Sequence, residues 1–286
     1  MIRSLHPGGR YRLALVMVLL VSAVSGCASF KEIKSFASLS SNAASYGVLT
    51  RDYIEALDRR KQYQPEKFHG ELEAQKMRRE AQRASLDILQ QTVTDYMQAL
   101  GGLASGEIRA FDKSLEDLSK NLNDATLLDN NEKDAVGALS TILARTVTAT
   151  YRLHELKKIV QEGNQPLQDV IHATRRIVKK GMIGDLRVES TLVERYYDNF
   201  MLAPNNPVEP VAMALAKEAK AEALGRVDNR IRSVQAYDDV LETIARGHQY
   251  LYDHRDMIGN DEFDQQLKQY IGELRSAYKS LLDISR

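Results

Sequence analysis

The chain has 286 residues, of which 43% are hydrophobic and 27% charged, and its 39 basic residues balance 39 acidic ones. This apolar fraction excludes an intrinsically disordered chain. The balanced charge argues against nucleic-acid binding, because no excess of Lys and Arg is available to neutralise phosphates. A single Cys excludes an internal disulfide framework and a multi-cysteine metal site, and six Pro residues in so long a chain favour helix.

Residues 1–26 have the pattern of a secretory signal peptide. Arg3, Arg10 and Arg12 precede the apolar run Leu13–Val21, which residues 22–24 extend. As a helix, residues 13–24 would span about 18 Å, whereas the hydrocarbon core of a bilayer is about 30 Å thick. The run is therefore too short for a permanent transmembrane helix.

This run ends in Val24-Ser25-Gly26-Cys27. The pattern resembles the lipobox of bacterial lipoproteins, in which one branched and two small residues precede the Cys that receives diacylglycerol. The resemblance implies signal cleavage between Gly26 and Cys27, lipid attachment at Cys27, and a membrane anchor made by N-terminal acyl chains. An ordinary signal peptide with an incidental Cys is the alternative. The resemblance covers residues 1–27 only, and no family is identified from the mature region.

Ala28 and Ser29 follow the Cys. In Gram-negative lipoproteins an Asp at the first of these positions retains the protein in the inner membrane, so the resemblance implies an outer-membrane anchor facing the periplasm. In other bacteria it implies the extracellular face of the cell membrane. Removal of residues 1–26 takes away three Arg and no acid, which leaves a net charge of −3. The lipid, rather than attraction to anionic headgroups, then provides the anchoring.

The mature sequence predicts an all-α fold. Apolar residues recur every three or four positions, and sustained alternation with period two is not found. About seven helices are expected after the signal peptide, over residues 30–63, 65–100, 107–127, 129–163, 166–202, 211–258 and from 261 onward. Several exceed the mean length of about 11–12 residues, which indicates an elongated antiparallel bundle, with a solenoid as second choice.

Glycine and proline set the expected helix boundaries. Pro65 interrupts the first helix, and the glycines at 101, 102 and 106 end the second. Gly163 closes the fourth helix, Pro166 occupies the first turn of the fifth, and the glycines at 181 and 184 bend it.

Three Pro residues in 203–210 predict a linker loop. The loop separates a bundle region, 27–202, from a C-terminal helical hairpin, 211–286, packed on the same bundle. Whether it divides two domains stays open.

The first helix has a heptad seam with small residues in its middle. The seam consists of Ile33, Phe36, Ser40, Ala43, Gly47, Thr50, Ile54 and Leu57. Small residues allow a second helix to approach closely, and they could also leave room for an apolar ligand. The first half of the second helix, Glu66–Arg83, is much more polar and is either a solvated extension or a partner surface.

Local motifs for catalysis are missing from the sequence. It contains no phosphate-binding glycine loop, no nucleophile elbow and no His-Glu-x-x-His motif, and its Cys is assigned to lipid. We therefore predict a non-enzymatic protein without catalytic residues, cofactor or metal site. An enzyme whose site is assembled from distant residues is the reserve hypothesis.

Three polar clusters could serve a site, although a solvated helix face is the favoured interpretation of each. His248, Tyr252 and Asp256 share a face as a polar or metal-binding patch. The other two clusters are the acids Glu189, Glu194 and Asp198, and the basic face Arg175, Arg176, Lys179 and Lys180.

One aromatic cluster precedes the predicted loop. Tyr196, Tyr197, Phe200 and Met201 form a candidate recognition patch, because exposed aromatic and Met side chains are favoured at interfaces. The alternative is that these side chains close one end of the bundle.

Together these features predict a lipid-anchored, envelope-facing helical protein that acts as adaptor, scaffold or inhibitor of another envelope protein. The alternative is a carrier or sensor of an apolar ligand, such as a lipid or acyl chain, held between helices. Self-association stays open, because heptad seams serve internal packing and oligomers equally well.

Overall fold

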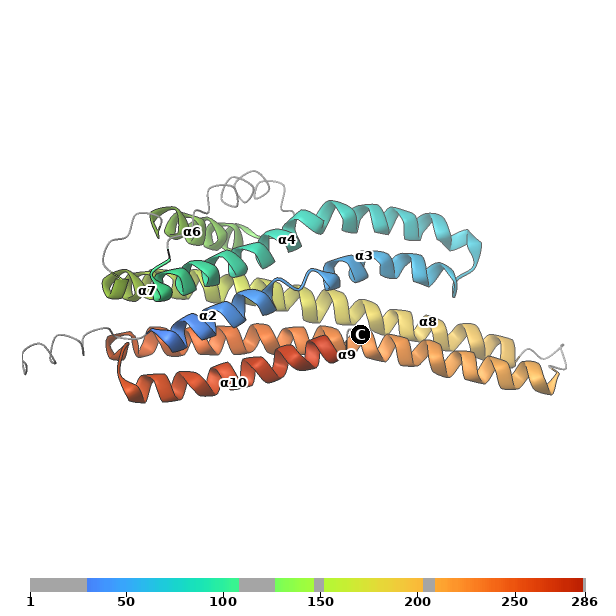
Figure 1. Cartoon of the computed structure of the whole chain (residues 1–286). Coiled ribbons are helices and arrows are strands. Elements are labelled where there is room, and N and C mark those ends of the chain that lie inside the picture. The colour runs from blue at the N-terminus through green and yellow to red at the C-terminus, as the bar shows by residue number, and fades with distance from the viewer. Residues whose placement is uncertain (1–29, 108–126, 147–151, 203–208, 285–286) are drawn as a thin grey trace, which may run out of the picture.

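The computed structural model describes residues 30–107, 127–146, 152–202 and 209–284 (Figure 1). The predicted signal peptide with Gly26 and Cys27 lies outside these ranges, as do most of the predicted helix 107–127 and of the linker 203–210. Over the described ranges the chain is an all-α bundle without strands, which confirms the predicted fold class. No helix in these ranges is both long enough and apolar enough to span a bilayer.

The described residues form eight α-helices. They are α2 (Lys31–Ala44), α3 (Val48–Lys61), α4 (His69–Ser105), α6 (Asn130–Thr146), α7 (Arg152–Arg176), α8 (Gly184–Met201), α9 (Pro210–Asp253) and α10 (Asp261–Ile284). Two 3₁₀ turns, η1 (Glu66–Phe68) and η3 (Arg255–Met257), and a π-helical segment, η2 (Ile177–Ile183), complete the order. η2 joins α7 to α8 without interruption, and only a short break lies between α2 and α3, so we count each of these pairs as one rod. The eight helices thus make six rods, close to the seven helices predicted.

The rods run side by side in an elongated molecule with two distinct ends (Figure 1). The start of α2, which directly follows Phe30, lies toward one end, which we call the Phe30 end, and α9 also finishes there. The opposite end is formed by residues 196–202, at and just after the end of α8, and residues 209–215, at and just before the start of α9; we call it the hairpin end. At 1.5 Å per residue, the 44 residues of α9 span about 66 Å between these ends.

Small residues let α2 pack closely against α4. The predicted seam is buried from Ile33 to Leu57, except for Gly47, which is exposed where α2 and α3 part. On α4, a Cβ added to Gly101 would lie 3.4 Å from the Cβ of Ala37. The small side chains therefore contribute to the close packing of α2 against α4.

Helix α4 continues past the glycines at 101 and 102, so the predicted end at Leu100 is wrong. Gly106 ends it in the left-handed conformation, with φ of 78°. The N–H groups of Gly106 and Glu107 donate to the carbonyls of Leu103 and Gly102, at 3.3 and 2.9 Å. A glycine ends a helix where its own backbone adopts the left-handed conformation, and of the glycines at 101, 102 and 106 only Gly106 adopts it.

The predicted single helix over 129–163 is also wrong. Helix α6 ends at Thr146, and α7 begins at Arg152 and packs alongside α6. Arg145 Nη1 lies 3.4 Å from Glu162 Oε2, whereas these residues would be about 25 Å apart along one continuous helix. Apolar residues recur with the same spacing in α6 and in α7, so this spacing could not reveal that the chain reverses direction between the two helices.

Helix α7 runs through Gly163 and Pro166, where a boundary was predicted. Proline inside a helix removes one backbone hydrogen bond and costs about 3 kcal/mol. Leu167 and Val170 are fully buried just beyond it, so tertiary packing outweighs the local preference.

Glu209 caps α9, since its Oε2 accepts hydrogen bonds from the N–H groups of Val211 and Ala212, both at 3.1 Å. Pro210 follows at the first helical position, where its missing N–H costs nothing. At α10 the capping side chain is Asn260, whose Oδ1 accepts a hydrogen bond from the Glu262 N–H at 3.1 Å. The expected bend near Gly181 corresponds to η2.

Candidate functional site

Exposed apolar side chains gather at the hairpin end. Ten large apolar side chains are exposed within the described residues, and five of them lie here. They are Tyr196 at 49%, Phe200 at 46%, Leu202 at 77%, Val211 at 60% and Leu215 at 60% exposure. Figure 1 shows this end extending beyond the turn that joins α3 to α4, which is why the bundle leaves it uncovered.

The predicted recognition patch falls on this end. Tyr196 and Tyr197 contact each other edge to face, with ring centroids 5.3 Å apart, and both contact Tyr63 after α3, at 5.6 and 6.4 Å. Phe200 is exposed and Met201 half-buried beyond them. The tyrosines thus rest on the α3–α4 turn, and the two later residues project past it.

Sequence reasoning missed the part of this surface that α9 contributes. Val211 and Leu215 are exposed one helical turn apart at the start of α9. Their signal in the sequence was the apolar run over 211–216, directly after a proline. A helix start that is apolar on every side indicates either burial or an interface.

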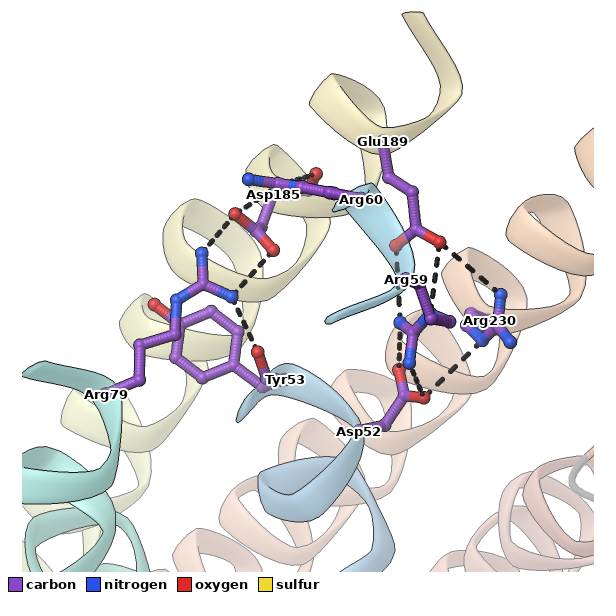
Figure 2. Close-up of polar contacts among 8 residues, drawn as sticks. All are labelled: Asp52, Tyr53, Arg59, Arg60, Arg79, Asp185, Glu189 and Arg230. Atoms are coloured by element: carbon purple, nitrogen blue, oxygen red, sulfur yellow. Dashed lines mark hydrogen bonds and ion pairs between the residues drawn. The ribbon is translucent and has the colours of Figure 1, made fainter. Parts of the chain in front are cut away.

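A network of ion pairs, most of them partly buried, links α3, α4, α8 and α9 (Figure 2). The Arg59 guanidinium bridges two carboxylates, with Nη1 2.9 Å from Asp52 Oδ1 and Nε 3.0 Å from Glu189 Oε1. Arg230 of α9 approaches the same two carboxylates at 3.4 and 3.7 Å. Glu189 is only 1% exposed, so its predicted place on a solvated face is wrong.

Asp185 is the centre of the second half of this network. It accepts hydrogen bonds from Arg79, and Arg60 donates to its backbone carbonyl and pairs with its carboxylate. The Arg79 guanidinium also stacks over the ring of Tyr53, 4.1 Å from the centroid. The polar first half of α4 thus contacts α3 and the start of α8 rather than solvent alone.

His248 is fully buried, so both interpretations of its cluster are wrong. Its Nε2 lies 2.7 Å from Tyr96 Oη, and its Nδ1 lies 2.9 Å from Asn164 Oδ1. Burial lowers the pKa of the imidazole to about 3, which keeps it neutral at physiological pH. Tyr252 is half-buried and Asp256 lies beyond the end of α9, so the three residues share no face.

The predicted basic face is largely ion-paired rather than solvated. Arg175 contacts Asp238 at 2.8 Å and Glu242 at 2.6 Å, and Lys179 contacts Asp238 at 3.0 Å. Arg176 pairs with Glu132 at 2.8 Å, and Lys180 is exposed.

The structure also brings three carboxylates together on α9. One oxygen from each of Asp238, Asp239 and Glu242 lies within 4.8 Å of the others. Burial opposes ionisation of Asp238, but hydrogen bonds from Arg175 and Lys179 outweigh it, so the pKa of Asp238 lies below its ordinary value. Two cations of the chain itself thus partly neutralise this cluster, and we assign no metal to it.

Of these features, the hairpin end is the one whose chemistry suits binding. Contiguous exposed apolar surface marks interaction sites, and aromatic residues are enriched at the core of protein interfaces. The ion pairs of Glu189, seven residues before Tyr196 on α8, tie this helix to α3 and α9 near that surface. Comparison of the chain with known protein families, with curated proteins and with solved structures finds no match.

Proposed function

We propose that the protein is a lipid-anchored, non-enzymatic adaptor that binds another envelope protein through its hairpin end. One observation carries the proposal: five exposed apolar side chains belong to the end of α8 and the start of α9, at the end of the molecule opposite the start of α2. Monomeric proteins rarely leave such a cluster uncovered unless it is a contact surface.

The predicted anchor at Cys27 would place the hairpin end away from the membrane. Cys27 precedes Phe30 by three residues, which can extend about 11 Å at most. Lipid on Cys27 would therefore hold the Phe30 end close to a membrane. The hairpin end would stand off by a distance approaching the 66 Å or so of α9.

This arrangement suits a tethered protein that reaches a partner away from its own membrane. In a Gram-negative source the membrane would be the outer membrane and the partner would be met in the periplasm. In other bacteria the protein would project from the extracellular face of the cell membrane.

Site-specific photo-cross-linking in intact cells tests the binding surface. A photoreactive amino acid is placed at Phe200 or Leu215, and the matched control is Leu153, which is 41% exposed at the start of α7 near the Phe30 end. We expect a defined protein adduct from the hairpin end and none from Leu153. Identical adducts from all three positions would show non-specific proximity and refute the proposal.

The anchor is tested separately, by intact-mass measurement of the mature chain and by Cys27→Ala. We expect the mass of a lipid-modified chain that begins at Cys27. Cys27→Ala should abolish the lipid, and combined with replacement of residues 1–26 by a cleavable signal peptide without a lipobox it should release the protein from membranes and abolish the hairpin-end adduct. An unmodified Cys27 in the mature protein would contradict the anchor while leaving the contact surface in place.

Carriage of an apolar ligand has weaker support. The small residues that suggested space between helices pack α2 against α4, as the contact between Ala37 and Gly101 illustrates. Native mass spectrometry that detects a retained apolar molecule would restore this alternative.

A further inference from the structure

The seven-residue π-helical segment η2 joins α7 to α8 within one continuous rod. A π turn holds one residue more than an α turn, because its hydrogen bonds join residues five apart rather than four. The residues of α8 are therefore displaced by one position, a rotation of about 100° and a shift of about 1.5 Å, from where an unbroken α-helix would place them. Such turns are rare and are often found at functional sites.

The apolar contacts of α8 would be similar with or without this displacement. Three pairs of adjacent residues, four positions apart, each join two apolar or aromatic side chains of which the second is the more buried: Leu192 with Val193, Tyr196 with Tyr197, and Phe200 with Met201. Either tyrosine can rest on Tyr63, since both rings already contact it. A shift by one residue would put the first member of each pair in the place of the second, with a side chain of similar chemistry.

Ion pairs and one buried leucine favour the present register. The carboxylates of Asp185 and Glu189 face arginines of α3, α4 and α9. In the shifted register Gly184 and Val188 would occupy their places, and these arginines would lose two acidic partners. The same shift would move Leu186, now buried, to an exposed position. The shifted register is thus the less stable of the two, although it keeps α8 helical and retains most of its apolar contacts.

The end of α7 is held in place independently of α8. Arg175 pairs with Asp238 and Glu242 of α9, at 2.8 and 2.6 Å, and Arg176 pairs with Glu132 of α6 at 2.8 Å. A change in the register of α8 would therefore be absorbed within η2 rather than passed back along α7.

We infer that η2 is a register switch for the hairpin end. When η2 closes to an α-helix, α8 turns by about 100°, and Tyr196 and Phe200 move from exposed places into the half-buried places of Tyr197 and Met201. Elements that pack in two discrete arrangements are a common basis of such switches. The inference rests on the proposed function, because it names how that same surface is regulated. A partner bound to Tyr196 and Phe200 holds η2 in the π form, since a ligand favours the state that presents its contacts.

Thiol labelling detects the closed form in the chain from residue 27 with Cys27→Ala. Val193→Cys is the reporter, because Val193 is fully buried and moves to the exposed place of Glu194 when η2 closes. Val227→Cys, at an equally buried position on α9, is the matched control and reacts only on global unfolding. In dilute urea, Val193→Cys should react at least about tenfold faster than the control and with little dependence on urea, since a local change exposes little new surface.

Two variants change the switch in opposite directions. Deletion of the exposed Lys180 removes the extra residue of η2, so an α-helix then keeps the present register and Val193→Cys should react as slowly as the control. Glu189→Gln removes a carboxylate that holds the present register and should speed the reaction at least about tenfold. Glu222→Gln, which removes an exposed ion pair, should leave it unchanged. Each rate is compared with that of Val227→Cys in the same variant, so that a loss of global stability is not mistaken for the switch.

Two outcomes would overturn the inference. Equal rates for Val193→Cys and Val227→Cys at every urea concentration would show that α8 has a single register. A fast reaction at Val193→Cys that survives deletion of Lys180 would show fraying of α8 rather than a change of register. Neither result bears on the photo-cross-links from Phe200 in cells, whose absence would instead refute the proposed function.

Discussion

The Nε2 atom of His248 on α9 lies 2.7 Å from the Oη atom of Tyr96 on α4, and both side chains are fully buried. Asn164 of α7 completes the contact, with its Oδ1 2.9 Å from His248 Nδ1 and its Nδ2 donating to Gln249 at 2.8 Å. One imidazole therefore joins three helices through polar contacts inside the core. Protonation of this imidazole opposes folding, because a positive charge at the buried position would lose its hydration.

This contact predicts that acid destabilises the protein through His248. The pKa is about 3 in the folded chain, against 6.5 for an ordinary histidine. Below pH 6.5 the unfolded chain thus binds a proton that the folded chain does not. The stabilising contribution is complete above about pH 6.5 and is lost as the pH falls toward 3, by up to about 1.4 kcal/mol per pH unit.

Urea unfolding at a series of pH values measures this slope. His248→Gln should reduce the pH dependence of the free energy of unfolding between about pH 6.5 and 4.5. The matched control is His172→Gln, on the exposed face of α7. In the intact protein, nuclear magnetic resonance should show the His248 ring protons unchanged down to pH 4.5. A ring that titrates near pH 6 would contradict the buried neutral state.

Gly247 predicts a steric effect on stability. A Cβ at this position would lie 2.4 Å from Cε2 of the Phe36 ring, so Gly247→Ala must displace a buried aromatic side chain. Overpacking of this kind costs about 1–3 kcal/mol. Gly225 lies on the same helix with open space around it, so Gly225→Ala should stabilise the protein by about 0.5–1 kcal/mol. Thermal unfolding of the two variants should shift in opposite directions, and equal shifts would refute the close packing of α2 on α9.

The ion-pair network predicts a large cost for removing one buried carboxylate. Glu189→Gln leaves Arg59 and Arg230 with Asp52 as their remaining acidic neighbour, and breaking a buried pair costs about 3 kcal/mol. Glu222→Gln removes an exposed pair with Arg226 on α9 and should cost about 0.5 kcal/mol or less. The free energy of unfolding in urea gives both values, and similar losses would indicate that the network is solvated.

The length of α9 can be measured directly. Spin labels at Val211→Cys and Asp253→Cys, in a chain whose single Cys27 is replaced by Ala, should lie about 63 Å apart if α9 is continuous. Pulsed electron paramagnetic resonance measures such distances. A broad distribution centred well below this value would indicate a break at Gly225 and would shorten the reach on which the proposed function depends.

Much of the helical architecture could be predicted from local patterns. Residues from Ile33 to Leu57 follow a heptad seam, and all its members but Gly47 are buried. The predicted break near Pro65 and the turn at Gly259, with φ of 96°, are also present. Each of these features depends on a period or a breaker residue within a few positions, which sequence displays directly.

Most of the errors share one cause. The reversal between α6 and α7, the passage of α7 through Pro166, and the burial of His248 and Glu189 all depend on residues far away in sequence. A carboxylate on α8 is buried because Arg59 and Arg230 come from α3 and α9 to meet it, and no local pattern indicates that meeting.

The sequence by itself thus determined the helical class, the heptad seam of residues 33–57 and the resemblance to lipoproteins at Cys27, because periodicity, breakers and the lipobox are local. Only the tertiary structure decided which polar side chains are buried and which apolar ones stay exposed. The α3–α4 turn does not reach as far as the end of α8 and the start of α9, and Phe200 and Leu215 remain exposed there although their pattern resembles that of buried residues. Burial is a property of what packs against a residue, and that depends on how the helices are arranged.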